Sequence, residues 1–129
     1  MWVKRVVNGE ARFVGAIGDQ LRIRVVATFV SPEAEPVDFT DHTWLAQIRR
    51  RTNAGLFATL DLIEDNSTFE VGSPTNLYTV DLLYGLDNTT GFLDGVRYLY
   101  GVKAISGDLA PYTLVRADPI YGYEVVPHE

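Results

Sequence analysis

The chain has 129 residues, with 11 basic and 17 acidic side chains, a net charge of −6 and no cysteine. These values exclude disulfide bonds, thiol catalysis and zinc–thiolate sites. They also argue against nucleic acid as a partner, because phosphate contacts need clustered Lys and Arg. Hydrophobic residues make up 47% of the chain, enough for one buried core. No apolar run approaches the roughly 18 residues of a membrane span, so we expect no membrane partner. The length suits a single domain, residues 1–129.

The first predicted strands, Trp2–Val7 and Ala11–Ile17, flank the dipeptide Asn8-Gly9. Both turn residues tolerate positive φ, so the pattern predicts an N-terminal hairpin closed by a tight primed turn. We treat residues 1–19 as an extension of a core that spans residues 20–126.

Apolar residues then recur with period two in five runs, which is typical of half-buried strands. The runs cover residues 21–29, 43–50, 56–63, 77–84 and 96–104. In the third run, Leu56, Ala58, Leu60 and Leu62 are expected to share the inward face. The residues predicted for the core are Trp44, Ile48, Leu60, Tyr98 and Tyr100.

Turn residues separate these runs. Loops are predicted at residues 31–36 and 66–76, a hairpin at residues 52–55, and a turn at residues 106–108. Pro119 is expected to end a strand over residues 112–117 and to leave residues 120–126 as a short separate or edge strand. For residues 88–93 the sequence allows a short helix or 3₁₀ turn as an alternative to a loop. The sum is an all-β fold of about eight strands, an antiparallel sandwich or a small barrel.

The sequence gives weak support for catalysis. A catalytic base would have to be His42 or His128, and no Gly-x-Ser-x-Gly elbow occurs. Asp38 and Asp41 could bind a calcium ion, an alternative that the sequence does not decide. A glycosidase or metal hydrolase would need the carboxylates of these two residues to converge with that of Asp87. We therefore expect no catalytic, metal-binding or cofactor-binding residue, and no enzyme.

Three features are candidates for partner contacts. Arg49, Arg50 and Arg51 form the one basic run, which could dock a carboxylate-rich partner or merely keep a hairpin end solvated. Tyr121 and Tyr123 share one face of the last predicted strand, and Trp2 lies in a strand that need not join the core. Tyr and Trp are enriched at interfaces, although both termini could equally fold back and bury these rings.

One run of residues resembles a known family. His42-Thr43-Trp44-Leu45-Ala46-Gln47-Ile48-Arg49 is similar to the Trp-x-Ala-Gln-hydrophobic-Arg strand of immunoglobulin-like (Ig-like) structural proteins of tailed bacteriophages. Residues 89–102 and the pair Ser106–Asp108 and Tyr112–Leu114 resemble later segments of that family. The register around Arg97 and Gly101 departs from the family pattern. The N-terminal hairpin and the aromatic C-terminal segment are additional.

The resemblance implies a single Ig-like antiparallel β-sandwich of 7–9 strands with an extra N-terminal hairpin. It also implies a non-enzymatic virion component that is assembled in the host bacterial cytoplasm, forms homo-oligomers and binds other capsid or tail proteins. A capsid decoration protein is the first expectation, and a tail, neck or baseplate adaptor is the second. A carbohydrate-binding module is a further alternative, which would require a row of coplanar exposed aromatic rings.

Overall fold

The structure, a computed structural model, describes residues 1–34, 42–51, 54–105 and 112–124. These ranges contain strands β1 (Val3–Val7), β2 (Glu10–Ala16), β3 (Leu21–Pro32), β4 (Thr43–Arg49), β5 (Leu56–Asp65), β6 (Thr68–Glu70), β7 (Thr75–Leu86), β8 (Arg97–Ile105) and β9 (Tyr112–Tyr123). The all-β fold is therefore confirmed. No helix in the described ranges is long and apolar enough to cross a membrane.

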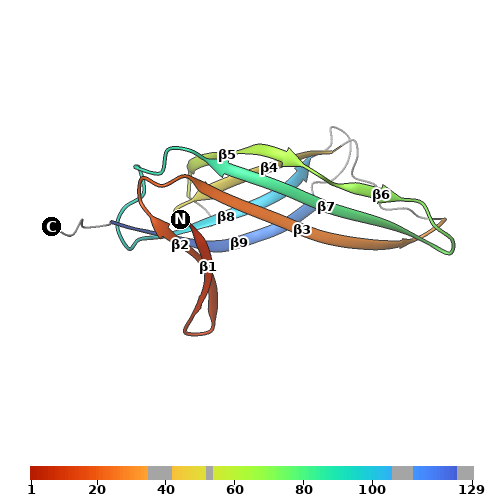
Figure 1. Ribbon diagram of the computed structural model, residues 1–129, viewed down its shortest axis with the longest axis horizontal. Coiled ribbons are helices and arrows are strands. Elements are labelled where there is room, and N and C mark those ends of the chain that lie inside the picture. Colours follow the sequence, from red (N-terminus) through yellow and green to blue (C-terminus); the bar gives the residue numbers. More distant parts are fainter. Residues whose placement is uncertain (35–41, 52–53, 106–111, 125–129) are drawn as a thin grey trace.

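The strands pair in the order β1-β2-β9-β8-β4-β5-β7-β3, and β6 adds to β7. The sheet curls so that β3 and β7 lie in front of β4, β8 and β9, with β5 connecting the two layers (Figure 1). The β1–β2 hairpin stands away from this body. Within the described residues, β1 and β3 are the two ends of the strand order.

The expectation of a purely antiparallel sheet is wrong at one ladder. β2 runs parallel to β9, with Phe13 opposite Ile120 and Ala16 opposite Tyr123. β1 takes the outer place, and β2 lies alongside β9 before the chain crosses to β3. The predicted extension is thus paired to the body by one of its two strands.

The predicted hairpin turn at Asn8-Gly9 is present. Both residues have positive φ, 51° and 80°, as a type I′ turn requires. Val7 pairs with Glu10 directly across the turn. The local sequence specifies this connection, because Asn8 and Gly9 both tolerate left-handed conformations and are the two residues between the paired strands.

One cluster of buried side chains fills the space between the layers. All five residues expected in the core lie in it: Trp44, Ile48, Leu60, Tyr98 and Tyr100. The facing layer contributes alternate residues of β3 and β7, among them Leu21, Ile23, Val80, Leu82 and Tyr84. The period-two pattern places these side chains inward because successive residues of a strand point to opposite faces.

The pattern fails in β5. Leu56 and Leu62 are 51% and 43% exposed, whereas Leu60 is buried. The ladder to β4 skips a residue between Ala58 and Leu56, and the ladder to β7 skips one after Leu62. The first bulge inserts an unpaired residue between Ala58 and Leu56, which reverses the facing of Leu56. The second lies beyond Leu62, so it does not account for the exposure of Leu62. The bulges also let β5 leave the layer of β4 and join that of β7.

Two local predictions are wrong, and one alternative that the sequence left open is not realised. The predicted loop 66–76 contains β6, which pairs with β7. β9 continues through Pro119, which pairs with Leu99 of β8. Its ladder to β2 begins only at Ile120, so Pro119 lies where β9 has one neighbour and its missing N–H is tolerated. Residues 88–93 form turns and bends, with no helix.

Candidate interaction surfaces

Trp2, expected as a contact residue for partners, is a core residue in the structure, with 6% of its surface exposed. Its ring lies 5.4 Å from that of Phe92, and its Nε1 donates a hydrogen bond of 3.1 Å to the carbonyl oxygen of Asp19. A Cβ atom at Gly15 would collide with the indole. The ring is therefore buried against β2, in the space that a residue without a side chain provides.

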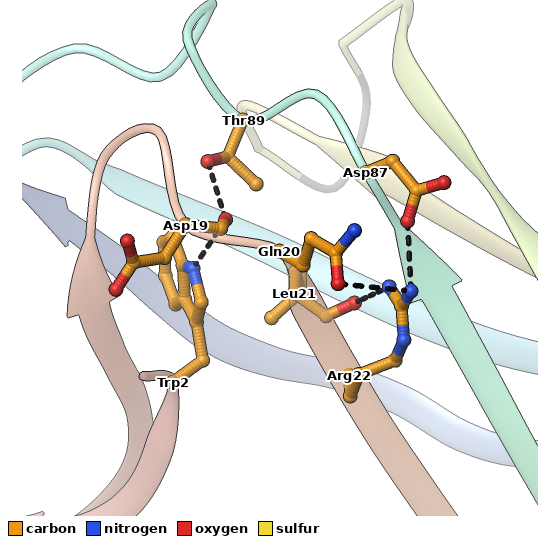
Figure 2. A network of polar contacts seen from close by, with 7 residues as sticks. All are labelled: Trp2, Asp19, Gln20, Leu21, Arg22, Asp87 and Thr89. Carbon is orange, nitrogen blue, oxygen red and sulfur yellow. Dashed lines mark hydrogen bonds and ion pairs between the residues drawn. The ribbon is translucent and has the colours of Figure 1, made fainter.

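Thr89 holds the turn beside Trp2, as Figure 2 shows. The Thr89 hydroxyl accepts a hydrogen bond of 2.8 Å from the Gly18 N–H and donates one of 2.8 Å to the Asp19 carbonyl oxygen. Only 1% of Thr89 is exposed. These bonds join the 17–20 turn to the segment after β7. Sequence reasoning missed Thr89, which looked like one of several polar loop residues.

The same figure shows how Arg22 ties β3 to the segment after β7. Its guanidinium lies 2.8 Å from the carboxylate of Asp87 and donates to the Leu21 carbonyl oxygen and the Gln20 side chain. Asp87 was the residue required to converge with Asp38 and Asp41 in an enzyme site. Its carboxylate pairs with Arg22, and Asp38 and Asp41 lie outside the described residues.

Tyr121 and Tyr123 lie side by side, with ring planes 13° apart and centroids separated by 6.5 Å. The Arg12 guanidinium covers the ring of Tyr121 at 4.4 Å, and the Tyr121 hydroxyl accepts a hydrogen bond of 3.3 Å from Arg97. Tyr123 is 42% exposed. Tyr121 is thus engaged within the chain, and Tyr123 remains the accessible ring of the pair.

Glu10 completes this attachment of the hairpin. Both of its carboxylate oxygens accept from Arg97, at 2.8 and 2.9 Å, and Arg12 lies 3.3 Å away. The hydrogen bond from Arg97 lowers the pKa of Glu10 below its ordinary value. Charged groups from β2 and β8 therefore fasten the hairpin to the body through exposed ion pairs.

The three arginines of the basic run do not form one patch. Arg49 is half-buried and donates hydrogen bonds to the Ala54 carbonyl oxygen and to the Gln47 side chain, at 2.9 and 3.1 Å. Arg50 and Arg51 are exposed, and the Arg50 guanidinium lies 5.6 Å from the centre of the Tyr98 ring. Consecutive strand residues point to opposite faces, which separates Arg49 from Arg50.

Arg49 instead lines a groove of about 230 Å³ on the outer face of β4, β8 and β9, which we call the cationic groove. It is lined by Leu45, Gln47, Arg49, Leu99, Tyr100, Gly101, Val102, Lys103, Thr113, Val115, Arg116 and Ala117. Among the described residues, the lining includes three cations and no carboxylate. Lys103 and Arg116 were missed from the sequence because neither has a basic neighbour in the sequence.

A second hollow of about 370 Å³ lies at the base of the hairpin. Its lining is largely apolar and comes from β1, β2 and the end of β9: Met1, Val3, Arg5, Val7, Val14, Gly15, Ala16 and Tyr123. Tyr123, a predicted contact residue at the end of β9, therefore shares this hollow with residues of the N-terminal hairpin.

Several titratable groups of the body have pKa values shifted by burial or by a charged neighbour. Burial raises the pKa values of the Tyr84 and Tyr100 hydroxyls, and Asp65 and Asp118 respectively add to that effect. The hydrogen bond from Arg24 lowers the pKa of Asp81. Across the described ranges, no group of three His, Asp or Glu side chains is placed to hold a metal ion.

No protein-family model, no curated protein and no solved structure matches this chain.

Proposed function

We propose that the chain is a non-enzymatic structural component of a tailed-phage virion, with a capsid decoration protein as its first assignment. The observation that carries the proposal is the N-terminal hairpin, which stands away from a β body and ends the strand order at β1 (Figure 1). An edge strand offers backbone N–H and C=O groups for pairing with another chain. The hairpin also adds apolar surface at its base, which suits a partner contact.

The pairing order supports the Ig-like part of the proposal. In immunoglobulin domains, strands C, F and G are neighbours in one sheet, and strands B, E and D are neighbours in the other. Here β4, β8 and β9 follow the first order, and β3, β7 and β6 follow the second. The two longest stretches that resemble the phage family, residues 42–49 and 89–102, include β4 and the first part of β8, which are neighbours in this arrangement.

Tyr121 bears on the carbohydrate-binding alternative. Sugar-binding platforms need aromatic faces that are open to a ring of the ligand, and Arg12 covers the ring of Tyr121. Tyr123 alone offers little stacking area. The arrangement therefore favours protein contacts over polysaccharide binding, and retention on insoluble polysaccharide would contradict this choice.

Labelling of particles tests the proposal. Phage particles from cells that make the protein are labelled with gold-conjugated antibody against it and imaged by electron microscopy. A decoration protein gives label over the whole head, and a tail, neck or baseplate adaptor gives label at one vertex or along the tail. Particles without label would refute the virion assignment.

A matched pair of variants tests the hairpin. Val6 on β1 and Val71 beyond β6 are 73% and 75% exposed, so neither is needed for the core. We expect Val6→Glu to lower the amount of protein on purified particles and Val71→Glu to leave it unchanged. Equal incorporation of both variants would show that the hairpin makes no contact in the particle.

A further inference from the structure

The cationic groove brings together three cations that have no carboxylate partner among the described residues. Arg22, Arg24 and Arg97 each have a carboxylate at 2.6–2.8 Å. Lys103 and Arg116 form no ion pair within the described residues, although the chain has six more acidic than basic side chains. Asp118, close to Arg116 in the sequence, lies 3.4 Å from the Tyr100 hydroxyl and does not line the groove.

Gly101 forms the floor of the groove at an irregular part of the sheet. Tyr100 pairs with Asp118 and Val102 with Val115, so β9 has one extra residue opposite Gly101. A Cβ atom at Gly101 would lie 3.1 and 3.2 Å from the carbonyl oxygens of Val115 and Arg116. These two oxygens therefore lie close to the floor, and a larger residue would fill the space beside them.

The positions of the cations define an elongated site. Arg49 pairs with Leu99, and Lys103 lies four residues further along β8. At about 3.3 Å per residue, the two positions are about 13 Å apart. Arg116 borders the middle, beside Gly101. Leu45, Leu99 and Val115 supply apolar surface between the charges.

We propose that this groove binds an extended, acidic peptide segment of a partner protein, with carboxylates at both ends and apolar side chains between them. Arginine pairs well with carboxylates because its planar guanidinium donates two parallel hydrogen bonds. Gln47 and Ala54 hold the Arg49 side chain in place, which reduces the entropy lost on binding. This proposal is independent of the proposed function, because the groove would bind such a peptide whether or not the protein is a virion component.

The shape and polarity of the groove favour a peptide over a small anion. One phosphate ion cannot reach cations that are about 13 Å apart along a strand. The carbonyl oxygens near Gly101 repel an anion composed only of acceptors, whereas a peptide has N–H donors to present to them. An extended chain of five residues covers the same length and carries carboxylates four residues apart on one face.

Fluorescence anisotropy with a labelled synthetic peptide tests the proposal. The probe is a short peptide of threonine and valine with two glutamates four residues apart, and the control probe has glutamine in their place. We expect the glutamate probe to bind the full chain, more weakly as salt is raised, and the glutamine probe to bind at least about tenfold more weakly.

Two double variants with the same change in net charge separate the groove from general electrostatics. Lys103→Glu with Arg116→Glu alters exposed groove residues, and Lys4→Glu with Arg5→Glu alters exposed residues of β1. We expect the groove variant to lose about tenfold in affinity and the β1 variant to stay close to wild type. Far-UV circular dichroism checks that both variants fold.

Three results would overturn the proposal. The first is no binding of the glutamate probe to wild type at millimolar protein. The second is an equal loss of affinity in the two double variants. The third is displacement of the probe by inorganic phosphate or a single-stranded oligonucleotide as effectively as by unlabelled peptide, which would identify a general anion site.

Discussion

Replacing Trp2 with alanine tests whether the N-terminal segment belongs to the core. Truncation of a buried aromatic side chain costs about 3–5 kcal/mol of unfolding free energy. Trp2→Ala removes the packing on Phe92 and the hydrogen bond to Asp19. Thr89 still holds the adjacent turn, so we expect a loss near the lower limit, about 3 kcal/mol.

Gly15 makes this test specific to the observed position of the ring. In wild type, Gly15→Ala forces a methyl group into the indole of Trp2, and overpacking of this kind costs about 1–3 kcal/mol. In the Trp2→Ala background the obstacle is gone. Alanine is then better than glycine within a strand by about 0.5–1 kcal/mol, so the same substitution changes from destabilising to stabilising.

Urea unfolding of the four proteins, followed by far-UV circular dichroism, measures this coupling. Trp fluorescence is unsuitable because Trp2→Ala removes one of the two tryptophans. A Trp2→Ala variant as stable as wild type would refute the burial of the ring. Equal effects of Gly15→Ala in the two backgrounds would refute its position against β2.

Two further predictions concern polar contacts. Thr89→Val leaves the Gly18 N–H and the Asp19 carbonyl without the hydroxyl, so we expect about 1–3 kcal/mol less unfolding free energy and near wild-type stability for Thr89→Ser, both measured by urea unfolding. Glu10 has a lowered pKa, so its ionised form stabilises the fold above the unfolded-state value near 4.5 and this contribution disappears as pH falls through the folded-state value. The Tm difference between wild type and Glu10→Gln should shrink over that range, and a constant difference into strong acid would contradict the ion pair with Arg97.

Period-two alternation predicted the central strands and their core residues because both effects are local. Trp44 and Ile48 in β4, and Tyr98 and Tyr100 in β8, lie inward as their spacing requires. The turn at Asn8-Gly9 was equally predictable, because these two residue types tolerate the positive φ that the turn requires. In each case the information needed lies within a few residues of the sequence.

The failures have non-local causes. The bulges in β5 arise because one strand pairs with two different layers, and nothing within residues 56–65 indicates that transfer. The burial of Trp2 depends on Gly15, which leaves room for the indole, and on Phe92, far along the chain. The cationic groove unites Arg49 with Lys103 and Arg116 through strand pairing, whereas the sequence grouped Arg49 with its neighbours Arg50 and Arg51.

The basic residues fall into two groups, those that form ion pairs within the chain and those that line the cationic groove. Arg22, Arg24 and Arg97 are neutralised by carboxylates that fasten β3 to β7 and the segment after it, and the hairpin to β8. The cations of the outer face of β4, β8 and β9 have no such partner in the described residues. In a chain with a net charge of −6, this face therefore offers cations to an acidic partner, within the roughly 8–10 Å over which charges act at physiological salt. Complementary charge of this kind supplies orientation as well as affinity, so an acidic peptide bound in the groove would be held in one direction along β8.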